Sequence, residues 1–135
     1  MPGTALRIPK TEAVSLWQDG QCLIPRLRVA RGIGERGIGL MFRRKIPEKC
    51  GAGYLFPRCR ELHTFWMRFP LDMLWLDAEG VPVQRRENVP PGRIVRGPPE
   101  ARHVLEVAAG TLPQTGGTPI CIREAQELAK PPALG

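Results

Sequence analysis

The segment LHTFWMRFPLDMLWLD, residues 62–77, holds two largely apolar runs on either side of Pro70. On a strand, successive side chains alternate between the two faces of the sheet. From residue 71 to residue 76 both faces are therefore apolar, except at Asp72. A strand that is apolar on both faces belongs in the interior of a sheet. We therefore predict strand, bend and strand over residues 62–77, with the second strand deep in the sheet.

Asp72 is a charged residue, which is unexpected in a buried strand. A buried carboxylate is costly unless it accepts hydrogen bonds, pairs with a cation or becomes protonated. One interpretation is structural: Asp72 caps the bend at Pro70 or accepts backbone N–H bonds there. The other is functional: Asp72 works with His63 and Arg68 in a pocket, because an arginine–carboxylate pair suits a partly desolvated position. The residues alone leave both interpretations open.

Glu106, in the apolar run VLEV at residues 104–107, repeats this pattern. If its side chain lines the same pocket as Asp72, two carboxylates and nearby arginines converge on a polar site for a small ligand. Our leading hypothesis is a non-enzymatic domain that binds a small polar ligand or a peptide. The predicted cleft is lined by Trp66, Arg68, Asp72 and Glu106.

An enzyme is the alternative, with Asp72 or Glu106 as the general base and His63 as a further catalytic candidate. A general base needs a pKa near the working pH, which partial burial can supply. Whether any reaction is catalysed stays open. Cys59 and His63 have a spacing compatible with two metal ligands, but zinc sites usually have paired motifs. We therefore predict no metal and no cofactor.

Charge and hydropathy narrow the choice of partners. The formal net charge is +7, yet the arginines are scattered along the chain, which favours a solvated basic surface over nucleic-acid binding. A nucleic-acid accessory protein is the third hypothesis. The N-terminal stretch has no apolar run of signal-peptide length, and no stretch approaches a membrane span. We expect a cytoplasmic protein with reduced thiols.

The remaining sequence predicts one β-rich domain over residues 12–123. Residues 1–11 are expected to form a flexible tail, and residues 124–135 a short helical turn followed by a disordered tail. Six to eight short strands indicate a mainly-β fold, a compact antiparallel β-sandwich or barrel-like domain with one or two short helices. The G-x-G-x-x-G pattern at residues 32–37 lacks the long helix that a dinucleotide site needs, so a glycine-rich loop or loose helix is expected there.

One turn dipeptide and two prolines help to place individual strands. Asp19-Gly20 is favoured in tight hairpins because both residues can take a positive φ. Pro25 indicates an edge strand or a bulge, and Pro82 an edge strand, because proline cannot donate to the ladder. An exposed edge invites pairing with another chain, so a partner-binding module is a further hypothesis.

A family resemblance rests on four segments taken together: GLMFRR (39–44), GYLF (53–56), CRELHTFWMRFPLDMLWLDAEG (59–80) and RHVLEVAAG (102–110). Their order and approximate spacing resemble the prokaryotic family known as domain of unknown function 192, over about residues 22–122. The resemblance implies a compact, mainly antiparallel β-sandwich with a short helix, and no established reaction. It carries over the motif positions Arg43, Trp66, Met67, Asp72, Glu106 and Gly110. The predicted ligand-binding residues are Arg43, Trp66, Met67, Arg68, Asp72 and Glu106.

Overall fold

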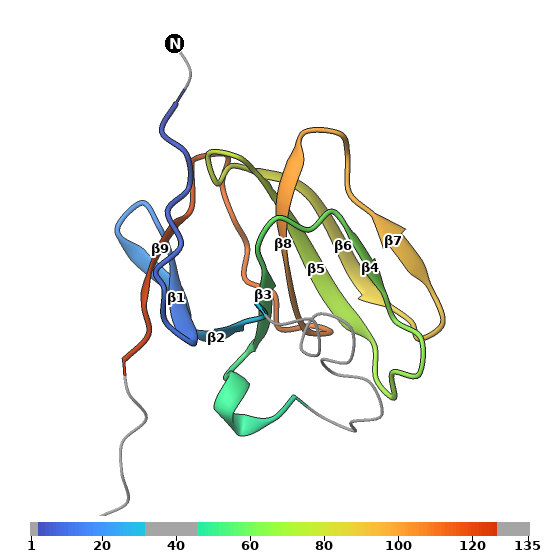
Figure 1. The fold of residues 1–135 in the computed structure, drawn as a ribbon. Coiled ribbons are helices and arrows are strands. Elements are labelled where there is room, and N and C mark those ends of the chain that lie inside the picture. The colour runs from blue at the N-terminus through green and yellow to red at the C-terminus, as the bar shows by residue number, and fades with distance from the viewer. Residues whose placement is uncertain (1–2, 32–45, 127–135) are drawn as a thin grey trace, which may run out of the picture.

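The regular structure of this chain is almost wholly β (Figure 1). The computed structural model describes residues 3–31 and 46–126, and the account below concerns this part of the chain. One short 3-10 turn, η1 (Glu48–Cys50), accompanies the strands. The strands are β1 (Ala13–Gln18), β2 (Gln21–Val29), β3 (Gly53–Phe56), β4 (Glu61–His63), β5 (Leu71–Asp77), β6 (Pro82–Val89), β7 (Ile94–Arg96), β8 (Ala101–Ala108) and β9 (Cys121–Glu124).

Seven strands form one sheet in the order β6-β5-β8-β3-β2-β1-β9, and β4 and β7 form a second, two-stranded sheet. All strand pairs are antiparallel except β2 and β3, which run parallel. The predicted mainly-β fold class is confirmed, as a layered arrangement whose sheets do not close into a barrel. The glycine-rich stretch at residues 32–45, including Arg43, lies outside the described residues, as does the part of the predicted helical turn and tail at 124–135 that follows residue 126. Glu124, the first residue of that prediction, ends strand β9.

The local turn and proline signals are mostly confirmed. Asp19 and Gly20 have φ angles of +50° and +79° and connect β1 to β2, as expected for a tight hairpin. Pro82 begins β6, which is an end strand of the large sheet. Pro25 lies in β2 where the register with β1 is irregular, so the bulge is the correct alternative. The edge alternative for Pro25 is wrong, because β2 is an interior strand.

Strand β5 lies between β6 and β8, and residues 71–76 are all buried. This confirms the prediction for the second half of the 62–77 segment. Because side chains alternate, Met73 and Trp75 pack into one core while Leu74 and Leu76 pack into another. The apolar character of both faces of β5 therefore reflects two separate cores, one on each side of the sheet.

The two cores are covered in different ways. The first core lies beneath the β4–β7 sheet, which contributes Leu62 and Val95. The second core takes side chains from strands along the whole large sheet, including Leu74 of β5, Leu27 of β2 and Ile122 of β9. The large sheet therefore rolls around the second core.

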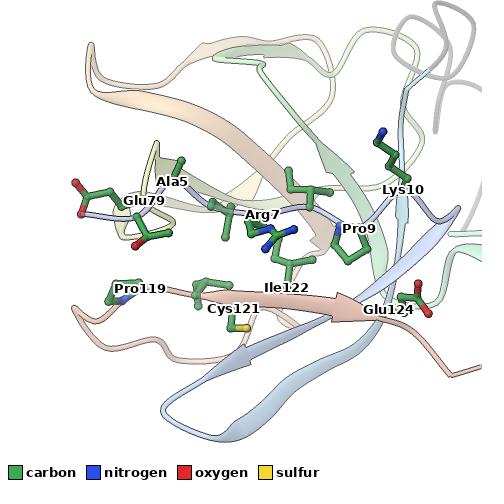
Figure 2. Close-up of a pocket in the computed structure, with 13 residues that line it drawn as sticks. Ala5, Arg7, Pro9, Lys10, Glu79, Pro119, Cys121, Ile122 and Glu124 are labelled. Carbon is green, nitrogen blue, oxygen red and sulfur yellow. The ribbon is translucent and has the colours of Figure 1, made fainter. Parts of the chain in front are cut away.

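The N-terminal segment, residues 3–10, runs beside β9 (Figures 1 and 2). It is the part of the chain that the sequence predicts as a flexible tail, and it has no helix or strand. The backbone N–H of Leu6 donates to the carbonyl oxygen of Ala78 at 2.7 Å, and the N–H of Gly3 donates to Oε1 of Glu79 at 3.1 Å. Leu6 and Ile8 pack against the second core. The segment therefore covers the part of that core near β9.

Gly97 provides the space that the buried indole of Trp75 occupies. A Cβ atom at residue 97 would lie 2.2 Å from Cδ1 of Trp75. The indole is fixed by burial and by its Nε1, which donates to the carbonyl oxygen of Arg60 at 2.8 Å. We expect Gly97→Ala to lower the free energy of unfolding by about 1–3 kcal/mol, the usual cost of overpacking a core.

Urea denaturation of the parent and the variant measures this loss. Gly117→Ala is the matched control, because a Cβ atom there meets nothing within 4 Å. It should change the free energy of unfolding by less than about 0.5 kcal/mol. Equal losses in the two variants would contradict the packing argument.

Candidate functional site

The carboxylate of Asp72 is buried, with 2% of the residue exposed, and it accepts three backbone hydrogen bonds. Oδ1 accepts the N–H of Asn88 at 2.9 Å. Oδ2 accepts the N–H groups of Gly110 at 2.9 Å and Leu112 at 3.3 Å. Asp72 therefore accepts backbone N–H bonds, but its donors lie in β6 and after β8 rather than at the bend at Pro70, where the structural interpretation placed them.

These bonds fix the start of the connection between β8 and β9, residues 109–120. Gly110, a motif position of the family resemblance, has φ +84° and donates directly to Asp72. Two further side chains hold the connection. Arg85 donates to the carbonyl oxygens of Leu112 and Pro113 at 2.8 and 2.7 Å, and Gln18 accepts the N–H of Gly116 at 2.8 Å. The position of β9 therefore follows from contacts made along the whole connection.

Asp72 and Glu106 lie on opposite faces of the large sheet. In the β5–β8 ladder, Asp72 is opposite Val107 and Met73 is opposite Glu106. Val107 belongs to the second core and Met73 to the first. Because side chains that face each other across a ladder point to the same side of the sheet, the two carboxylates point apart. The prediction of one cleft containing both is wrong, and the register between β5 and β8 is the physical reason.

Glu106 is nearly enclosed, with 5% of the residue exposed, between Tyr54 of β3 and Met73 of β5. Among the described residues no cation or hydrogen-bond donor contacts its carboxylate. Burial raises the pKa of Glu106 to about 8. A raised pKa is what a general base requires. Here the cause of the raised pKa is burial, which disfavours the charged form of Glu106 and keeps its carboxyl away from solvent.

The remaining predicted residues belong to the layer that covers the first core. Met67 is buried in that core, whereas Trp66, Arg68 and His63 are exposed on the outer surface. They are therefore not brought to the Asp72 carboxylate, whose side chain is on the other face of the large sheet. Their role in ligand binding stays a prediction.

An exposed aromatic patch forms on this outer surface from His63, Phe65, Trp66 and Ile94. The rings of His63 and Phe65 stack with centroids 5.5 Å apart and planes inclined at 25°. Phe65 and Trp66 contact each other edge to face at 6.1 Å. Ile94 of β7 is opposite His63 in the β4–β7 ladder and is 62% exposed.

A groove that sequence reasoning missed lies between the N-terminal segment and β9 (Figure 2). This β9 groove has a volume of about 770 Å³ and is lined by residues 4–10 and 119–122 together with Glu79 and Glu124. Leu6, Ile8 and Lys10 also line a second cavity of about 540 Å³, next to Arg58 and His103. The N-terminal segment therefore lies between two cavities, although Leu6 and Ile8 pack against the second core.

Strand β9 presents two backbone N–H groups without a partner among the described residues to this groove, whereas the carbonyl oxygen of Glu124 accepts the Ser15 hydroxyl at 3.2 Å. It is the end strand of the large sheet, and Ser15 is opposite Arg123 in its ladder with β1. Ala125 N–H donates to Ala13, so the N–H groups of odd-numbered β9 residues face β1 and those of Ile122 and Glu124 face outward. Within residues 3–31 and 46–126, neither of these two N–H groups has an acceptor.

Charges of both signs surround the β9 groove. Glu79 lies near one end, and Lys10 and Glu124 lie near the other, with Arg7 between them (Figure 2). The sequence signal for the groove is weak: Leu6 and Ile8 flank the charged Arg7, a spacing that an extended segment with one apolar face can have. That signal lies in the stretch that was interpreted as a tail.

The described residues set further limits on the site. They contain no helix long and apolar enough to cross a membrane. They also contain no group of three histidine, cysteine, aspartate or glutamate residues placed to hold a metal ion. The four cysteines are free thiols, with Cys22 and Cys121 exposed, Cys59 partly buried and Cys50 buried.

Fold and site together define a small two-layer β protein with an open sheet edge beside a groove. The family model of DUF192, described as “Uncharacterized ACR”, matches residues 14–119, well over half of the chain. The chain therefore belongs to the DUF192 family, and the resemblance carried by the four sequence segments is confirmed. No curated protein matches this chain closely enough to count as a relative.

Two solved structures are similar to most of the chain. A protein of Sinorhizobium meliloti 1021, described as a “putative transcription regulator”, is 27% identical with a TM-score of 0.63, covering 83% of this chain and 92% of its own. A protein of unknown function from Novosphingobium aromaticivorans DSM 12444 is 19% identical with a TM-score of 0.57, covering 79% and 83%. The second likeness shows the fold alone.

The raised pKa of Glu106 makes the stability of the protein depend on pH. Its carboxyl has an ordinary pKa of 4.5 when solvated and about 8 when buried. Between these values the folded protein holds a proton that the unfolded chain releases. The stabilising contribution is therefore complete below about pH 4.5 and is lost as the pH rises to about 8.

We expect Glu106→Gln, which does not titrate, to gain stability relative to the parent by up to roughly 4 kcal/mol between pH 5 and pH 8. Urea unfolding of both proteins across this pH range measures the difference. A difference that stays constant with pH would show that Glu106 titrates at its ordinary pKa, and the buried, neutral carboxyl would then be ruled out.

Proposed function

We propose that this DUF192 protein is a non-enzymatic binding module that takes up an extended peptide in the β9 groove. The peptide adds one strand to the free edge of β9. The observation that carries this proposal is the outward-facing backbone of Ile122 and Glu124 beside a groove of about 770 Å³. The proposal keeps the peptide ligand of the leading hypothesis but places it in the β9 groove instead of the cleft predicted from the sequence.

Backbone hydrogen bonding supplies the affinity in this mode of recognition. An added strand pairs with the N–H and C=O groups of an exposed edge, while alternate side chains of the peptide occupy the groove. Just before β9 begins, the same side of the chain is already paired, because the N–H of Ile120 donates to the carbonyl oxygen of Gly80 at 2.9 Å. A peptide would continue this pairing along Ile122 and Glu124.

The dimensions of the groove match a short extended segment. The β9 side of the groove runs from Pro119 to Glu124, and a strand rises about 3.3 Å per residue, so roughly five or six peptide residues fit alongside it. The groove volume lies within the range of ligand pockets, roughly 300–1,000 Å³. The cavity behind Leu6 and Ile8 supports this proposal, because it gives the N-terminal segment room to move aside.

Side-chain chemistry favours a peptide without strong net charge. The groove carries two cations, Arg7 and Lys10, and two carboxylates, Glu79 and Glu124. Its inner side is formed by the apolar side chains of Leu6, Ile8 and Ile122, which belong to or pack against the second core. We propose a ligand with apolar residues alternating with uncharged polar ones. The free thiols support the predicted cytoplasmic setting.

The test is Glu124→Pro, which removes one outward N–H and leaves the ladder with β1 intact. The probes are capped hexapeptides in which threonine alternates with valine, leucine or phenylalanine. We expect the affinity of the best hexapeptide, measured by calorimetry, to fall about tenfold in Glu124→Pro, since a lost hydrogen bond and a blocked strand act together. Glu124→Ala, which keeps the N–H, should bind within about twofold of the parent.

Cysteine alkylation gives an independent readout. Cys121 lines the groove and Cys22 does not, although both are exposed. Bound hexapeptide should slow alkylation of Cys121 and leave that of Cys22 unchanged. The proposal is contradicted if none of the hexapeptides binds, or if Glu124→Pro binds as well as Glu124→Ala.

A further inference from the structure

We infer that the aromatic patch is a second binding site, for single-stranded nucleic acid, with bases stacked on its rings and phosphates held by neighbouring arginines. The site is independent of the β9 groove. The patch belongs to the layer over the first core, whereas the groove lies against the second core on the other side of the large sheet.

The rings of the patch form a continuous exposed series. His63 contacts Phe65, and Phe65 contacts Trp66. Phe65 is 37% exposed and Trp66 is 64% exposed, so both rings offer surface to a ligand. Sequence-tolerant binding of single strands depends on aromatic rings of this kind, because every base has a face that can stack.

The backbone at Trp66, within the patch, is held in a costly conformation. Trp66 has φ +60°, an unfavourable angle for a bulky residue. The turn is fixed from below by Thr64, which is buried: its hydroxyl donates to the carbonyl oxygen of Pro90 at 2.7 Å and accepts the N–H of Arg93 at 2.9 Å. Met67, also buried, fixes the other end of the turn.

Three exposed arginines adjoin the patch. Arg93 is bonded through its backbone to Thr64, and Arg68 is two residues beyond Trp66. Arg96 lies on the outer face of β7, where its Nε is 3.3 Å from the carboxylate of Glu61. Guanidinium groups recognise phosphates in bidentate geometry. Stacked rings together with arginines favour a nucleic acid over an acidic peptide.

Fluorescence anisotropy with a labelled twelve-nucleotide oligo(dT) tests the inference on the intact chain. We expect binding whose affinity falls with added salt, by a slope of about −0.7 for each phosphate contacted. Trp66→Ala should weaken binding roughly ten- to hundredfold, while Trp66→Phe, which keeps a ring, should stay within about fivefold of the parent. Circular dichroism confirms that each variant is folded.

Charge variants separate the patch from the general basic surface. Arg93→Gln should reduce the steepness of the salt slope by about 0.7. Arg102→Gln removes another exposed arginine, which adjoins none of the patch residues in the ladders, and should leave affinity and slope nearly unchanged.

Three results would overturn the inference. One is no binding of oligo(dT) at low salt. The second is equal loss in Arg93→Gln and Arg102→Gln with no effect of Trp66→Ala, which would show diffuse charge attraction. The third is displacement of oligo(dT) by poly-glutamate together with insensitivity to Trp66→Ala, which would assign the patch to an acidic protein partner.

Discussion

The buried carboxylate of Asp72 holds strand β6 and the connection between β8 and β9 to strand β5. Asp72 lies in a buried interior strand of the sheet, where an unpartnered charge would be strongly destabilising. Three backbone N–H groups from β6 and from the β8–β9 connection converge on it. Hydrogen bonds to a charged acceptor are stronger than neutral ones. The connection is therefore held to β5 before it reaches β9.

The function proposed for β9 depends on this anchoring. The connection is 12 residues long, from 109 to 120, and such a segment would move freely if it were not bonded to the sheets. Asp72, Arg85 and Gln18 attach it at successive points. As a result β9 pairs with β1 on one side and leaves its other side open to the N-terminal segment. The fold thus provides an anchored sheet edge beside a groove, which suits the strand-adding ligand that we propose.

The sequence was informative where a pattern is local. Alternation predicted the interior position of β5, and Asp19-Gly20 predicted the first hairpin, because both depend on residues adjacent in the chain. The burial of Asp72 followed from its apolar neighbours in the same way. The hydrogen-bond donors of Asp72 could not be predicted in this way, since Gly110 and Leu112 are 38 and 40 residues away in the chain.

The candidate site was less predictable because it depends on register and on tertiary packing. The predicted cleft required Asp72 and Glu106 to face the same side, and the register between β5 and β8 sets them on opposite sides. A shift of one residue would have reversed the outcome, and no local pattern distinguishes the two. The β9 groove involves residues more than 100 positions apart, so only the folded chain brings its two sides together.

Native-state hydrogen exchange of Asp72→Ala tests the anchoring role most directly. The account predicts that the amide protons of Gly110 and Leu112, and that of Arg123 in β9, exchange roughly ten- to hundredfold faster than in the parent, while the amides of β5 keep their protection. If those three amides exchange at the parent rate, or if every amide in the protein accelerates equally, Asp72 does not hold β9 in place and the account is wrong.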